Sequence, residues 1–270
     1  MSNDHSHPGG AERFSRSHDP LRTDSAGNSW EGRAFHENPY AGDDGTTPAV
    51  VAEALAELRQ SGGSIRGVIA ALHGARLLIP LVAHAGEEFD PEAPIMEDKV
   101  QELAVVTVAG PDGRPVIPAF TSAAAMKSWN SDARPIPMDA QRVALAAASE
   151  GVDRIVLNAT TDDELIIRRP ALWALAQGQD WVPAWEDADL QRTLDKLVST
   201  IRGVVKLTLE PADLEGRGFT PELRVILHLV AGLTQEDLSV LVTKLNDVLT
   251  GSTALQMAAD SIELKLALAL

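Results

Sequence analysis

Apolar residues recur along this chain with two different spacings, and the changes between these spacings divide it into expected helices and strands. After Pro48, apolar side chains recur at helical spacing, at Val51, Leu55 and Leu58. The pair Gly62-Gly63 ends this helix, and a strand is expected over Arg76 to Val82. The pattern therefore predicts that ordered structure begins near Pro48.

The clearest unit of the chain is a hairpin followed by a capped helix. Two segments rich in β-branched residues, Val100 to Val108 and Arg114 to Phe120, flank the turn sequence Gly110 to Gly113. In the pair Thr121-Ser122, a hydroxyl is expected to cap the next helix by accepting a hydrogen bond from an unpaired backbone N–H. This order of elements identifies a fold unit but no reaction.

Short elements continue to Pro183, where the first folded unit is expected to close. They are an extended segment, a helix, two short strands and a helix opened by a proline: Arg134 to Pro137, Asp139 to Ser149, Asp153 to Ala159, Glu164 to Arg168, and the segment that starts at Pro170.

A second unit follows with its own alternation of helices and strands. A helix from about Asp187 precedes strands at Val204 to Glu210 and Glu222 to Val230, and Thr234 starts a helix with a capping-box-like sequence. The final residues alternate leucine with Glu263, Lys265 and alanine, as in a paired strand. The fold class is α+β, with two small sheet-and-helix domains behind an N-terminal tail.

The length and composition fit this division into domains. A chain of 270 residues with 44% hydrophobic content can bury two cores. Residues 1–47 are rich in Ser, Gly, Asn, Asp and His, so they are expected to form a disordered tail. The expected domains are then 48–185 and 186–270.

Charge and cysteine content exclude several classes of function. A net charge of −16 argues against binding to nucleic acid or to an anionic membrane surface. The chain has no cysteine, which excludes disulfides, thiol nucleophiles and cysteine-based metal sites. No secretory signal and no apolar run of membrane-spanning length are evident, so a cytoplasmic protein is expected.

The sequence around the hairpin resembles a known family. Val116 to Ser122, then Trp129, the extended Arg134 to Pro137 and the strand Arg154 to Asn158 are similar, in order and spacing, to the N-terminal domain of the SseB family of bacterial proteins. The resemblance covers roughly residues 50–183. The arrangement of elements from Leu190 onward looks like the C-terminal domain of the same family.

The resemblance implies a fold and supplies no catalytic residues. The family takes its name from an enhanced serine sensitivity phenotype and has no established biochemical activity. No active-site residue, metal ligand or cofactor can therefore be carried over to this chain.

Common catalytic patterns are also missing from the residues themselves. The glycine-rich stretch Gly62 to Gly67 lacks the Lys and Thr of a phosphate-binding loop. The histidines His73, His84 and His228 show no metal-ligand spacing, and the acidic run Asp162 to Glu164 is best interpreted as a solvated turn. We expect no catalytic residue, no metal site and no cofactor.

Six residues remain as a candidate pocket for a ligand or partner: Phe120, Trp129, Arg168, Arg169, Trp181 and Trp185. The two tryptophans near Pro183 lie at the expected domain junction, where pockets often form, and the two arginines could bind a carboxylate. The favoured interpretation of the aromatic residues is packing between domains.

The sequence thus favours a non-catalytic binding or regulatory module with an unidentified protein partner. The alternative is an enzyme or sensor that acts on an amino acid or small metabolite at the domain junction. Self-association through the last strand, Ser261 to Leu270, is a further expectation if that strand lies at a sheet edge.

Overall fold

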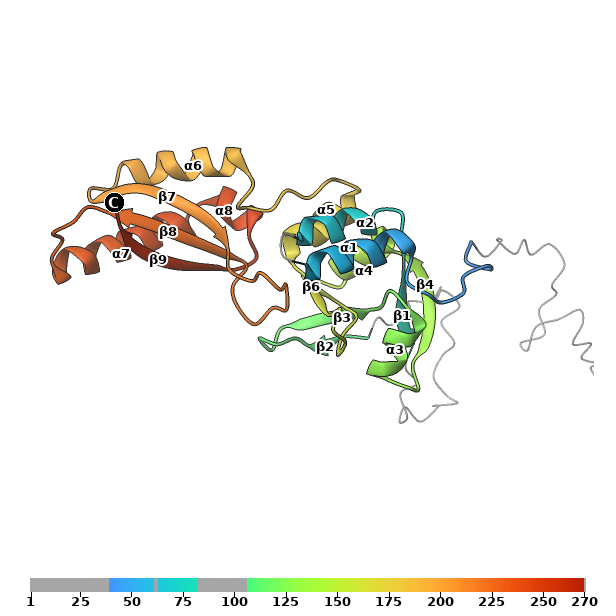
Figure 1. Cartoon of the computed structure of the whole chain (residues 1–270). Coiled ribbons are helices and arrows are strands. Elements are labelled where there is room, and N and C mark those ends of the chain that lie inside the picture. The colour runs from blue at the N-terminus through green and yellow to red at the C-terminus, as the bar shows by residue number, and fades with distance from the viewer. Residues whose placement is uncertain (1–38, 61–62, 82–105, 270) are drawn as a thin grey trace, which may run out of the picture. The chain divides into compact units, whose positions relative to one another are not determined.

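The computed structural model describes residues 39–60, 63–81 and 106–269. The chain divides into two units, Met1–Gly42 and Asp43–Leu270. All helices and strands of the described residues belong to the second unit (Figure 1).

A four-stranded sheet forms the centre of the first half of this unit. Its strand order is β2 (Val108–Ala109), β3 (Pro115–Ala119), β5 (Ile155–Leu157) and β6 (Leu165–Ile167). Only the β3–β5 pair is parallel; its neighbours are antiparallel. Every residue of β5 and β6 is buried, because both faces of the sheet are covered.

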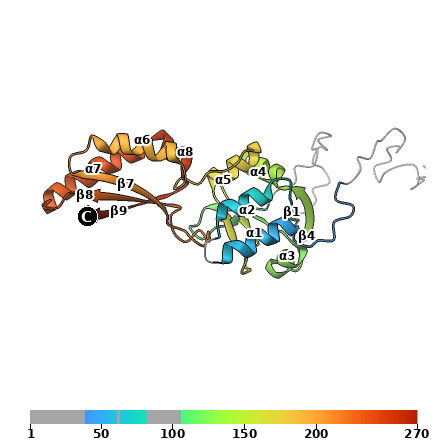
Figure 2. The same ribbon diagram turned by 45° about the horizontal axis from the view of Figure 1, so that its top comes forward.

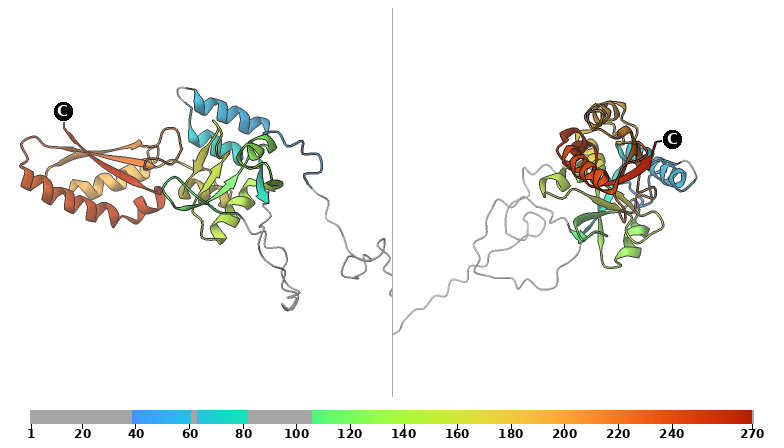
Figure 3. Two further views of the ribbon diagram at one scale, coloured as in Figure 1. Left: turned by 90° about the horizontal axis from the view of Figure 1, so that it is seen from below. Right: turned by 90° about the vertical axis from the view of Figure 1, so that its left-hand side faces the viewer.

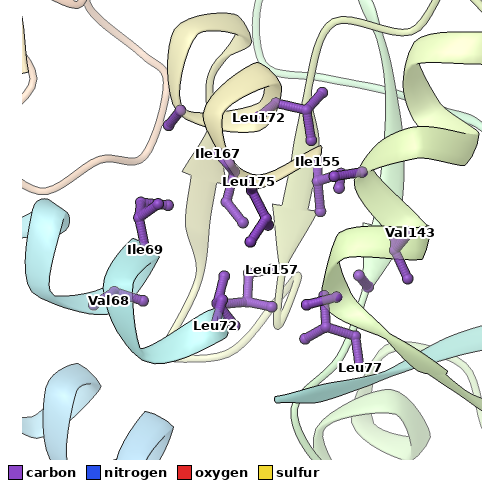
Figure 4. Close-up of a cluster of buried hydrophobic side chains, with 14 of the residues drawn as sticks. Val68, Ile69, Leu72, Leu77, Val143, Ile155, Leu157, Ile167, Leu172 and Leu175 are labelled. Carbon is purple, nitrogen blue, oxygen red and sulfur yellow. The ribbon is translucent and has the colours of Figure 1, made fainter. Parts of the chain in front are cut away.

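Four helices cover one face of this sheet: α1 (Ala49–Arg59), α2 (Ile65–Leu72), α4 (Ala140–Ser149) and α5 (Arg169–Gln177). Their apolar stripes meet the strand side chains in the main core, which is drawn in Figure 4. In that core, Leu72 from α2 and Leu175 from α5 point toward Leu157 of β5. Each of these three side chains is fully buried.

The other face packs against α3 (Ala123–Trp129) and a two-stranded antiparallel sheet of β1 (Arg76–Leu81) and β4 (Arg134–Asp139). A smaller core lies between them and contains Phe120 and Met126, both buried. The two sheets are linked by a bridge from Leu78 to Phe120.

The second half contains a three-stranded sheet in the order β7 (Val204–Pro211), β8 (Leu223–Leu229) and β9 (Ile262–Leu268). The β7–β8 pair is antiparallel and the β8–β9 pair is parallel. The helices α6 (Ala188–Ser199), α7 (Gln235–Thr250) and α8 (Thr253–Ala258) all lie on one face, as Figures 2 and 3 show.

Burial along β8 shows which side chains face the helices. Leu223, Val225, Leu227 and Leu229 are buried and belong to a separate core, whereas the residues between them are half-buried. This alternation is that of a sheet with one covered and one open face. The open face carries mostly polar and charged side chains.

The α+β class expected from the sequence is confirmed, and most elements begin within two residues of their expected positions. Two helices were not expected, α2 and α8. The expected strand Val100 to Val108 lies mostly outside the described residues, as do residues 1–38 of the expected tail. The segment Arg134 to Pro137, expected only as extended chain, is part of β4.

No helix within the described ranges is both long enough and apolar enough to cross a membrane.

Candidate functional site

Five charged side chains that are far apart in the sequence meet between the four-stranded and the three-stranded sheet. They are Arg154, Arg168, Asp213, Glu222 and Asp260, here called the junction cluster, and each side chain is at most 9% exposed. Each comes from an element boundary: Arg154 precedes β5, Arg168 is the N-cap of α5, Asp213 and Glu222 flank the β7–β8 loop, and Asp260 precedes β9.

Arg168 is bound entirely by groups of the chain itself. Its Nη2 donates to the Asp213 carboxylate at 2.5 Å and to the carbonyl of Thr220 at 2.7 Å. Its Nη1 donates to Ser261 Oγ at 3.1 Å and to Asp260 at 3.4 Å. Such charge-assisted contacts are needed because an unpaired buried guanidinium would be very costly.

Two further arginines share a pair of carboxylates. Arg154 donates to Asp112 at 2.7 Å and also binds Asp260. Arg114 binds the same two carboxylates, Asp112 at 2.7 Å and Asp260 at 3.1 Å. The two arginines differ in burial, because the Arg154 side chain is 2% exposed and that of Arg114 is 44% exposed.

Glu222 is the member of the cluster with the most unusual protonation. Its Oε2 accepts a hydrogen bond of 2.6 Å from the backbone N–H of Asp260. Burial raises the pKa of its carboxyl to about 7, although that hydrogen bond and the positive charge of Arg168 act in the opposite direction. This carboxyl therefore exchanges a proton close to neutral pH.

Asp112 and Arg114 border the junction cluster on its exposed side, and the pKa of each is shifted in favour of its charged form. Partial burial pushes the pKa of Asp112 upward, but the hydrogen bonds from Arg114 outweigh it and hold that pKa below its usual value. Burial opposes the charge of Arg114 too, yet the carboxylates of Asp112 and Asp260 raise its pKa. These groups form ordinary ion pairs.

A small cavity adjoins the cluster. Its polar lining comes from Arg168, Asp213 and Glu222, and its apolar lining includes Trp181 and Trp185, whose rings meet edge to face with centroids 6.2 Å apart. The space open to the centre of a water-sized sphere is about 20 Å³, enough for one water molecule. The buried Nε1–H of Trp181 has no hydrogen-bond partner among the residues that the structure describes.

The loop between β7 and β8 holds the cluster together by packing on the edge of the four-stranded sheet. The N–H of Ile166 in β6 donates to the carbonyl of Gly216 at 2.7 Å. Gly216 has φ of +67°, and a Cβ there would stand 2.3 Å from Cδ1 of Leu165. Glycine is therefore required for this close approach.

The neighbouring Arg169 has a different environment from Arg168. Its guanidinium lies over the ring of Trp173, 5.3 Å from the centroid, and donates to the carbonyls of Gln256 and Ala259 at the end of α8. The hydrogen bonds of Arg169 join α5 to the end of α8, whereas its cation–π contact with Trp173 lies within α5.

The six residues predicted to form a pocket are distributed over three places, one of which is the contact of Arg169 with the end of α8. Arg168, Trp181 and Trp185 line the same cavity. Phe120 and Trp129 instead contact each other, with ring centroids 5.5 Å apart, on the far face of the four-stranded sheet. A ligand or partner at any of these places stays a prediction.

A second polar group, at the carboxyl ends of the parallel strands β3 and β5, was not foreseen. The buried Asn158, in a left-handed conformation, accepts hydrogen bonds from the N–H and hydroxyl of Thr121. Arg76 binds Asp43 and the carbonyl of Thr121. Ser122 caps α3, which confirms the expectation that a hydroxyl of the pair Thr121-Ser122 caps this helix, while the Thr121 hydroxyl bonds to Asn158.

Sequence reasoning also missed the carboxylates of the junction cluster. Asp213, Glu222 and Asp260 are single acidic residues in loops or at a strand start, and nothing in their neighbourhood marks them as buried. Arg168 and Asp260 are separated by 92 positions, so their pairing depends on the tertiary fold. No group of three or more potential metal ligands occurs within the described ranges.

The ion pairs of the junction cluster connect the four-stranded sheet to the three-stranded sheet. Chemically, the cluster can hold one water molecule and exchange one proton at Glu222, while its guanidinium groups are directed at carboxylates and carbonyls of the chain.

Comparison with protein families shows that residues 51–174 match the SseB protein N-terminal domain. The matched region runs from α1 to α5 and contains Arg154 and Arg168 but none of the three junction carboxylates. No curated protein and no solved structure matches the chain significantly.

Proposed function

This chain belongs to the SseB family, and on that premise we propose that it is a non-catalytic binding or regulatory module that acts in the cytoplasm. The proposal concerns the molecular role of the folded unit. Its partner is expected to be another protein, because the strongly acidic chain is unsuited to nucleic acid or to anionic membranes.

The observation that carries the proposal is that the guanidinium of Arg168 is already hydrogen-bonded to groups of the chain itself. The pair Arg168-Arg169 was the candidate in the sequence for binding a carboxylate, and Arg168 is the member of the pair that lines the junction cavity. Two carboxylates, a carbonyl and a hydroxyl of the chain already accept from its guanidinium. A substrate carboxylate would have to displace buried ion pairs, which is unfavourable unless equivalent contacts replace them.

The size of the cavity supports the same role. Pockets for small molecules usually enclose about 300–1,000 Å³, whereas the junction cavity offers about 20 Å³. An amino acid could enter only if the β7–β8 loop moved away from β6. The contacts of that loop, including the Ile166–Gly216 hydrogen bond, oppose such movement.

The test is ligand-induced stabilisation of the purified full chain. A panel of amino acids that includes serine, with related carboxylates, is added at millimolar concentration, and the melting temperature is measured at pH 6 and pH 8. A binding module of this kind predicts no shift, whereas a ligand at 100 times its Kd would stabilise the fold by about 2.7 kcal/mol.

One observation favours the alternative, an enzyme or sensor of a small metabolite at the junction. Glu222 has a strongly raised pKa beside the cavity, and Trp181, which lines the same cavity, has a buried N–H without a hydrogen-bond partner within the described ranges. Perturbed groups of this kind occur often at functional sites. Stabilisation by a panel member that disappears in Trp185→Ala would favour the alternative and contradict the proposal.

A further inference from the structure

The strand β9 is an outer strand of the three-stranded sheet among the described residues. The carbonyl of Ser261 and the N–H of Ala269 both bond to the β8 side. Because successive residues of a strand alternate in direction, the odd-numbered residues of β9 face β8 and the even-numbered ones direct their N–H and C=O groups outward. This edge can accept another strand.

The open face of the sheet carries charges that alternate in sign toward this edge. Glu210 of β7 lies opposite Arg224 of β8, and Arg224 lies opposite Glu263 of β9. The Arg224 and Glu263 side chains form an ion pair of 2.5 Å. The charges of this row are therefore negative on β7, positive on β8 and negative on β9. A strand added beside β9 would be complementary if it placed a positively charged side chain opposite Glu263.

A second β9 strand supplies that cation in one antiparallel register. If the two copies are related by a two-fold axis at Leu264, Glu263 of each copy lies opposite Lys265 of the other. The outward-pointing groups of Leu264 then meet the same groups of its counterpart, as a hydrogen-bonded antiparallel pair requires.

Other registers also pair the outward-directed, even-numbered residues of the two β9 strands, but they are less favourable. An axis at Lys265 places the two Lys265 side chains opposite each other. An axis at Glu263 does the same for the two carboxylates, and an axis at Leu266 leaves both charges opposite alanines. Like charges in directly opposite positions destabilise a strand pair, so the axis at Leu264 is selected by charge.

In the same register, apolar side chains on the helix-facing side of the two β9 strands lie opposite one another. Ile262 and Leu266 are 38% and 42% exposed, which leaves apolar surface at the edge of the core. With the axis at Leu264, Ile262 of one copy lies opposite Leu266 of the other. The pairing therefore covers exposed apolar area on one face and joins opposite charges on the other.

We propose that β9 is a homodimer interface, at which a second copy of this chain adds its β9 in antiparallel orientation about Leu264 to form a continuous six-stranded sheet. This assembly is independent of any ligand at the junction cluster. A binding module that dimerises in this way presents two equal sets of surfaces to its partners.

The first test uses charge-swapped variants of the full chain and light scattering after size exclusion. The wild-type chain is expected to show twice the mass of 28.8 kDa at micromolar concentration. Lys265→Glu and Glu263→Lys should each be monomeric, because each places two like-charged pairs in its own homodimer. An equimolar mixture of the two should dimerise, since every cross-strand pair is again opposite in charge.

Lys265→Arg is the matched control and should keep the dimer, and circular dichroism should show that each variant is folded. A wild-type chain that stays monomeric across the concentration range overturns the proposal. So does a dimer that survives both charge reversals, which would place the interface elsewhere.

The second test uses the absence of cysteine from the sequence. In the proposed register, Leu264→Cys brings two thiols together at the two-fold axis, with Cα atoms about 5.5 Å apart, within the range for a disulfide. Leu268→Cys is the control, because its two thiols would lie about 27 Å apart at 3.4 Å per residue.

The control position is the more exposed of the two, with Leu268 67% exposed, so random collision would cross-link Leu268→Cys more readily. We expect oxidation to give a covalent dimer of Leu264→Cys and far less of Leu268→Cys. Equal or preferential cross-linking of Leu268→Cys would exclude the register about Leu264.

Discussion

The carboxyl of Glu222 gives the junction cluster a dependence on pH. Its side chain is buried, and its pKa is raised from 4.5 to about 7 in the folded chain, chiefly by burial. The folded state therefore holds a proton that the unfolded state has lost between pH 4.5 and 7. The favourable contribution to stability is complete below pH 4.5 and is lost as the pH rises to about 7.

Replacing this carboxyl with an amide should remove the pH dependence. In Glu222→Gln the side-chain oxygen can still accept from the Asp260 N–H, but the group no longer ionises. The free energy of unfolding of the wild type, relative to Glu222→Gln, should fall by about 3 kcal/mol between pH 5 and pH 8. Urea unfolding at a series of pH values measures this difference.

Because the wild type and Glu222→Gln share all other titrating groups, the difference between their free energies of unfolding reports on Glu222. Parallel pH profiles for the wild type and Glu222→Gln would show that Glu222 has an ordinary pKa, and the electrostatic description of the cluster would then be wrong.

At the level of single residues, the sequence could identify only one of the five residues of the junction cluster. Arg168 stood out because it lies beside a second arginine near the expected junction. Asp260 did not stand out, although it contacts Arg154, Arg114 and Arg168, because a lone aspartate before a strand is usually a solvated turn residue. Burial of a charge is a property of the tertiary fold.

Among the elements, β3 and β5 are each tied to the start of β9 by an arginine. Arg114 lies just before β3 and Arg154 just before β5, and both bind Asp112 and Asp260. The two arginines therefore make the same ion pairs at different depths. The degree of burial should decide how much each arginine contributes to the free energy of unfolding, because water screens exposed ion pairs.

Arg154→Met and Arg114→Met should thus differ in stability although they remove the same contacts. Loss of Arg154 leaves Asp260 partly uncompensated in a buried position and should cost about 3 kcal/mol or more. Loss of Arg114 should cost at most about 1 kcal/mol. Denaturant unfolding at pH 7 measures both, and equal costs would contradict the assignment of Arg154 to a buried ion pair.

Hydrophobic periodicity predicted most elements, and its failures have local causes. The helix α2 was missed because Gly62-Gly63 and Gly67 favour a break, whereas Ser64 in fact caps a helix that contains Gly67. The strand β4 was read as extended chain because prolines are unusual in strands, yet an antiparallel edge tolerates them. Pairings between distant segments could not be read from the sequence.

The molecule as a whole has an acidic chain, three hydrophobic cores among the described residues, and a junction whose charged groups pair with one another. These features favour a module that holds its sheets together and presents its surfaces to other proteins. The family match limits the assignment to a fold, because it covers residues 51–174 and carries no reaction. The claim that most needs a test is therefore protein binding itself.

Affinity capture from the lysate of the native host, read by mass spectrometry, tests this claim most directly. The baits are the full chain and a version that begins at Pro48, with a bait-free resin as background. The account predicts a partner that the full chain retains reproducibly above background, and loss of that partner from the shorter bait would assign the contact to residues 1–47. No retained protein with either bait, together with stabilisation by a small metabolite, would contradict a binding module and favour a junction enzyme.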